Sequence, residues 1–107
     1  MIDMPLESDW IMFKKHVPVW REQYLNHKNE SIAALLTDKE ESPIERFWNA
    51  KKMLKEDAYI LTSCLDQYSR SKMTISLSLM IRYGLIEEPD LVVFSDELRE
   101  QILAFGR

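Results

Sequence analysis

The side chains best suited to chemistry are two histidines and one cysteine, and their spacing separates them. His16 and His27 are eleven residues apart. On an unbroken helix that spacing puts both on one face but about 16 Å apart, which is too far to share a metal ion. Cys64 is the only cysteine, and no nearby basic residue in the sequence would activate its thiol. We therefore expect no metal site, no cofactor and no nucleophilic cysteine.

Sequence motifs that mark common enzyme classes are also missing. The chain contains no GxxxxGK[ST], GxGxxG, HExxH, GxSxG or CxxC pattern. Its two glycines are too few for a backbone loop that cradles phosphate groups. We therefore do not expect an enzyme.

A short basic stretch supports one binding function as an alternative. Residues 67–86 contain Arg70, Lys72 and Arg82 and no acid. Bases and hydroxyls at a helix start suit contacts with phosphate groups, so residues 69–82 could belong to a helix-turn-helix DNA-binding regulator. The basic count is low, however, and the expected turn lacks glycine.

The charge of the whole chain argues against nucleic acid as the main partner. The formal net charge is −4, and residues 87–107 alone hold six acids and two bases. The first 86 residues are therefore neutral overall. An acidic segment of this kind is most often a solvated helix face.

The clearest prediction of secondary structure comes from apolar residues that recur every seven positions. This 3-4 spacing indicates one long helix over residues 43–68, and Ser42-Pro43-Ile44-Glu45 has the composition of a helix start. The seam contains one polar member, Lys51. Its apolar members are Ile44, Phe47, Leu54, Ala58, Leu61, Leu65 and Tyr68.

The remaining pattern predicts an all-α fold in a single domain, residues 1–107. We expect helices over 8–27 with a kink at Pro18, 30–37, 71–83 and 89–104, with Gly84 as a stop signal. Ser95 could instead cap a separate final helix. These elements suit a small antiparallel bundle of four helices, or five if 30–37 stands alone, with left-handed heptad packing. The sequence leaves open whether 43–68 and 71–83 are continuous.

The heptad positions also predict which residues form the core, and they leave a ligand-binding groove as one alternative for the tryptophans. Trp10, Trp20 and Trp48 could line a groove for a ligand, although core packing is the commoner role for tryptophans at such positions. The expected core is Trp10, Phe13, Trp20, Phe47, Leu54, Leu61, Leu65, Leu77, Met80, Leu98 and Ile102.

Segment 71–83 suggests a function because it is apolar on more than one side. Ile75, Leu79, Tyr83 and Ile86 form a candidate protein interface, unless this helix is simply central to the core. We therefore expect a small protein-interaction or regulatory module that binds itself as a homodimer or another protein. The first residues do not resemble a signal peptide and no apolar run would span a membrane, so we expect a cytoplasmic protein.

Overall fold

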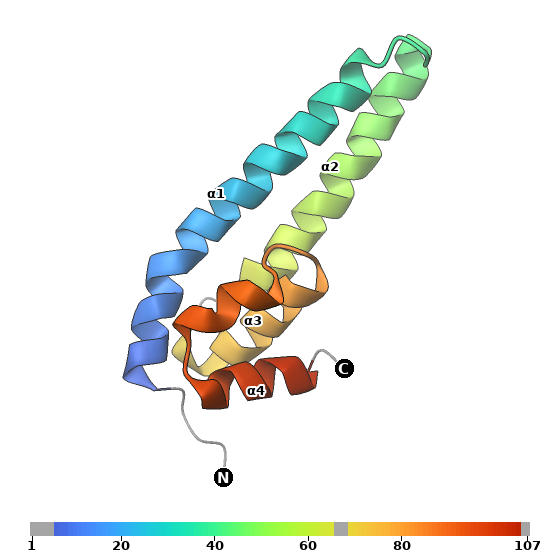
Figure 1. Cartoon of the computed structure of the whole chain (residues 1–107). Coiled ribbons are helices and arrows are strands. Elements are labelled where there is room, and N and C mark those ends of the chain that lie inside the picture. Colours follow the sequence, from blue (N-terminus) through green and yellow to red (C-terminus); the bar gives the residue numbers. More distant parts are fainter. Residues whose placement is uncertain (1–5, 66–68, 106–107) are drawn as a thin grey trace.

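The computed structural model describes residues 6–65 and 69–105, and the regular structure in that part of the chain is helical (Figure 1). The elements are α1 (Glu7–Thr37), α2 (Pro43–Leu65), the 3-10 helix η1 (Arg70–Lys72), α3 (Met73–Arg82), the 3-10 helix η2 (Glu88–Val93) and α4 (Asp96–Phe105). The predicted all-α helical bundle is confirmed.

A long hairpin dominates the shape of the molecule. Helices α1 and α2 run antiparallel, and Figure 1 shows α3, η2 and α4 gathered against only the lower end of this pair. We call residues 69–105 the C-terminal unit, and the end of the hairpin at residues 38–42 the tip. The molecule is consequently elongated, with extents of 55 × 22 × 22 Å. The half of the hairpin nearest the tip extends beyond the C-terminal unit.

Helix α1 is longer than the sequence indicates. It continues without a break through Asn29, where we expected one helix to end and a second to begin, so that prediction is wrong. Asn and His have low helix propensity, but packing against α2 outweighs it: Ile32 is buried and Lys28 pairs with α2. Pro18 lies inside α1 at an exposed position, and the expected kink there stays a prediction.

The predicted start of α2 is confirmed. Ser42 Oγ accepts a hydrogen bond from the Glu45 backbone N–H at 3.2 Å, which satisfies one unpaired donor of the first turn. The expected final residues of this helix, 66–68, lie outside the described residues. Ser69 has an extended backbone, with φ −149° and ψ 159°. Helices α2 and α3 are therefore separate elements.

The C-terminal unit departs from the predicted helix over 89–104. Gly84 has a φ of +81° and ends α3 as expected. The chain then forms η2, becomes extended at Phe94 and restarts as α4. The restart follows from Ser95, whose Oγ accepts the Leu98 backbone N–H at 3.3 Å. The alternative of a separate final helix capped near Ser95 is thus the correct one.

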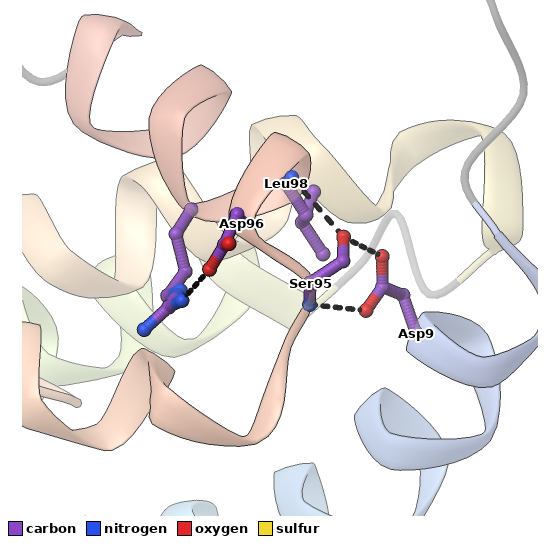
Figure 2. A network of polar contacts seen from close by, with 5 residues as sticks. Asp9, Ser95, Asp96 and Leu98 are labelled. Carbon is purple, nitrogen blue, oxygen red and sulfur yellow. Dashed lines mark hydrogen bonds and ion pairs between the residues drawn. The ribbon is translucent and has the colours of Figure 1, made fainter.

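A long-range contact fixes this restart to the beginning of the chain. The buried carboxylate of Asp9, in the first turn of α1, accepts the Ser95 backbone N–H at 2.8 Å and the Ser95 hydroxyl at 2.6 Å (Figure 2). Hydrogen bonds to an ionised carboxylate are among the stronger ones in proteins. The start of α4 is therefore held against the start of α1.

The main core lies where the C-terminal unit meets the hairpin. Of the predicted core residues, six are buried in this cluster, and Trp10, Leu61 and Leu65 are partly buried against it. Nearer the tip the buried apolar side chains are few, chiefly Ile32 and Ala50. The six confirmed residues are Phe13, Trp20, Leu77, Met80, Leu98 and Ile102.

Two predicted core residues are instead exposed. Phe47 leaves 58% of its surface accessible and Leu54 leaves 52%, so their assignment to the core is wrong. Helix α2 packs on α1 through a different seven-residue series, Ala50, Asp57 and Cys64. At 100° per residue that series lies about 60° to 100° around the helix from the apolar seam. The seam therefore points past α1, and near the tip nothing among the described residues covers it.

Candidate interaction surface

Four exposed apolar residues lie on the half of the hairpin nearest the tip, and together we call them the hairpin face: Leu36, Ile44, Phe47 and Leu54. The three residues of α2 span an arc of about 80° on the helix. Leu36 of α1 lies at the same level, because the Arg46 guanidinium donates to the Leu36 carbonyl at 3.4 Å. All four residues are about half exposed or more. An apolar strip of this kind on a helical pair is typical of a surface that binds another protein.

Two further aromatic residues of α2, Trp48 and Tyr59, are exposed on the side of the helix opposite the buried Ala50 and Asp57. The rings of Phe47 and Trp48 meet edge to face, with centroids 5.2 Å apart. Trp48 is 51% exposed and Tyr59 is 67% exposed. Half-exposed aromatic side chains each leave roughly 100 Å² accessible, so these three rings alone present roughly 300 Å².

A polar cluster between α1 and α2 favours one alignment of the two helices and so determines which side of α2 carries the exposed residues. Asp57 Oδ1 lies 3.7 Å from Lys28 Nζ, and Lys28 Nζ lies 5.4 Å from the centre of the Tyr24 ring. Burial, followed by the nearby Asp57 and Cys64, raises the pKa of Tyr24 to about 12. Shifting α2 along α1 would leave the buried Asp57 carboxylate without its cation, so this cluster favours one register. The register in turn fixes which side of α2 faces outward.

The charge is one-sided along the stretch of α2 that carries Phe47 and Leu54. Residues 46–55 of α2 contain four bases and no acid. Lys51, Lys52 and Lys55 are exposed, and Lys51 Nζ lies 4.7 Å from the centre of the Trp48 ring. We call residues 46–55 the basic strip. Its mixture of cations and aromatic rings favours a partner that is both apolar and acidic.

A second surface of opposite charge lies on the C-terminal unit. An open groove of about 770 Å³ runs between η2 and α4. Apolar side chains line it, including the buried Leu91 and the partly buried Leu103. The rim carries Glu88, Asp96 and Glu100, while the single base, Arg99, is already paired with Asp96. We call this the acidic groove.

The interface that the sequence suggested on α3 is only partly available. Ile75 is 40% exposed, whereas Leu79 and Tyr83 are partly buried against the core. Ile86 is only 2% exposed and belongs to the core, so it cannot contact a partner in this fold. Five of the ten residues of α3 are buried, which makes it the central helix of the C-terminal unit. The central-helix alternative therefore describes α3 better.

The three bases of the DNA-binding alternative do not form one surface. Arg70 pairs with Glu7 of α1, so part of its charge is already neutralised. Lys72 precedes α3 and Arg82 is the last residue of α3, so they lie at opposite ends of that helix. A recognition helix needs a long exposed side to enter the major groove, and the burial of α3 leaves little of one. Nothing in this geometry favours DNA over a protein partner.

The other side chains with chemical potential are dispersed. His16 stacks on Trp20 with centroids 5.3 Å apart, whereas His27 is exposed. Cys64 is completely buried, and burial raises the pKa of its thiol to about 11. Trp20 lies in the core and Trp48 near the tip, so the tryptophans do not converge on one pocket. Within residues 6–65 and 69–105, no three His, Cys, Asp or Glu side chains are close enough to hold a metal ion.

Sequence reasoning missed the hairpin face because it assigned two of its residues, Phe47 and Leu54, to the core. The signals that could have found it are the width of the apolar arc, with Trp48 and Tyr59 beside the seam, and the absence of acids from residues 46–55.

Comparisons with protein-family models, curated proteins and solved structures find no match for this chain. Among the described helices, none combines the length and apolar character needed to cross a bilayer.

Proposed function

We propose that this protein is a small interaction module that binds through the hairpin face and that associates with itself. The single observation that carries the proposal is the exposure of Phe47 and Leu54 in a heptad seam whose one polar member is Lys51. Seven-residue spacing of large apolar residues is the pattern by which helices pack together. Because α1 does not occupy this side of α2, a helix from another chain is the natural occupant.

The shape of the hairpin supports an interaction role rather than a purely structural one. The half nearest the tip buries few apolar side chains of its own. Ile44, Phe47 and Leu54 therefore contribute little to the fold of the isolated chain. When a partner covers their exposed area, the complex gains roughly 25 cal/mol of free energy per Å² of apolar surface buried. A regulatory role in the cytoplasm fits this proposal, since the lone cysteine offers no internal disulfide.

Sedimentation velocity over a range of protein concentrations tests the proposal. The comparison uses the wild type, the double variant Phe47→Ser/Leu54→Ser, and Ile75→Ser as a matched control on α3. We expect the wild type and Ile75→Ser to associate reversibly and the double variant to remain monomeric. Circular dichroism of each variant checks the fold, which should be retained because the three residues are 40% exposed or more.

Two results would count against the proposal. A wild type that stays monomeric at high micromolar concentration would remove self-association. Loss of association in Ile75→Ser, with normal association of the double variant, would move the interface to α3 and return to the surface that the sequence suggested.

A further inference from the structure

We propose that the occupant of the basic strip is the acidic groove of a second copy of this chain. The inference rests on the proposed function and specifies its contact. Two surfaces keep exposed side chains that no neighbour within one chain covers: the outer side of residues 46–55 of α2, and the groove between η2 and α4. Each combines apolar side chains with charges of a single prevailing sign.

The chemistry of the two surfaces is complementary. The basic strip offers Lys51 and Lys55 beside Phe47 and Leu54, all of them exposed. The acidic groove offers carboxylates on its rim and apolar side chains, such as Leu103, along its floor. Apolar residues of the strip would lie against the floor while the lysines reach the rim. Opposite charges at an interface rim steer encounter and fix orientation.

The two surfaces lie at opposite ends of the elongated molecule, as two simultaneous contacts require. In Figure 1 the first half of α2 lies toward the tip, whereas η2 and α4 lie at the opposite end. Two copies placed side by side in opposite directions would bring each strip against the groove of the other. This arrangement is a closed twofold dimer with two identical contacts, and closure avoids open filaments.

Other occupants fit the charges less well. A symmetric contact of one α2 with another would bring Lys51 and Lys55 of both copies together, which like charges oppose. A polyanion or an anionic membrane would meet the tip beside the strip, where residues 38–45 carry four acids and one base. The acidic groove instead brings opposite charges to the lysines over a compact surface. The second copy is therefore the occupant that the charges favour.

Charge exchange between the two surfaces provides the test. One variant is Lys51→Glu/Lys55→Glu and the other is Glu88→Lys/Glu100→Lys. Each alone should raise the dissociation constant of the dimer by about tenfold or more, because both contacts then pair like charges. An equimolar mixture should restore dimers to near wild-type affinity, because a mixed dimer pairs opposite charges at both contacts.

A matched control and the wild-type dimer make the outcomes distinct. Lys15→Glu/Arg21→Glu makes the same charge change at exposed positions of α1 far from the tip and should leave association within about threefold of the wild type. Failure of the mixture to associate, with an intact wild-type dimer, would overturn this contact and leave the proposed function standing. Association of the Lys51→Glu/Lys55→Glu variant as tight as that of the control would also overturn it. A wild type that never associates would instead remove the proposed function.

Discussion

A comparison of two leucine-to-alanine substitutions tests the central reading of α2. Leu77 of α3 is 0% exposed, and Leu54 of α2 is 52% exposed. Both substitutions remove the same three carbon atoms. At Leu77 the change leaves a cavity in a closed core, and the expected loss in free energy of unfolding is about 2–5 kcal/mol.

The expected loss at Leu54 is much smaller because half of the side chain is already in water. Three carbons contribute about 0.8 kcal/mol each when fully buried, so half burial gives about 1 kcal/mol, and water fills the space without a cavity. The assay is urea unfolding followed by circular dichroism at low protein concentration, where the chain is monomeric. At high concentration Leu54→Ala should also weaken association, which makes its effect on stability depend on concentration.

Equal losses at the two sites, independent of protein concentration, would refute this reasoning. They would mean that Leu54 is buried within a single chain. The hairpin face would then be part of the core and could not serve as a binding surface.

Three further predictions concern the fold. Asp9→Ala should lower the free energy of unfolding in urea by about 3 kcal/mol, because it removes two hydrogen bonds to the carboxylate and leaves the Ser95 donors unpaired. A double-mutant cycle with Ser95→Ala should show a coupling energy above about 1 kcal/mol, and additive effects would contradict the contact. Gly84→Ala should lower the free energy of unfolding by about 1 kcal/mol in the same assay. The cost comes from the backbone φ of +81° alone, since an added Cβ meets no atom within 4 Å. An unchanged urea midpoint would argue against this left-handed turn. Burial raises the pKa of the Cys64 thiol to about 11 and that of the Tyr24 phenol to about 12, so both groups ionise at lower pH in the unfolded chain than in the folded one. The free energy of unfolding should therefore be constant up to about pH 9 and fall toward pH 12. Cys64 should also be unreactive to thiol reagents until the chain unfolds, and rapid labelling of the native protein at neutral pH would contradict its burial.

Features that depend on neighbouring residues could be predicted from the sequence. Ser42 caps α2 and Gly84 ends α3 because capping and left-handed turns require particular side chains at particular positions. Phe13 and Trp20 could be assigned to the core because the 3-4 spacing of α1 coincides with the side that packs on its neighbours. The all-α class follows from the same periodicity.

Features decided by distant contacts could not be predicted in the same way. The start of α4 depends on Asp9, which lies 86 residues away from Ser95 in the sequence. The continuity of α1 depends on its packing against α2. Most important for function, α2 carries two series with seven-residue spacing, and the sequence alone does not say which one faces α1. Near the tip, the more apolar series, which contains Phe47 and Leu54, is the one left exposed.

Side-chain footprinting with hydroxyl radicals tests most directly whether the hairpin face is a binding surface. The oxidation rates of Phe47 and Trp48 are measured by mass spectrometry at low and high protein concentration, with Ile75 as the internal reference. The proposed association predicts rapid oxidation of both rings in the dilute protein and protection at high concentration, while the rate at Ile75 stays the same. Rates at Phe47 and Trp48 that do not change with concentration, whether fast or slow, would contradict it.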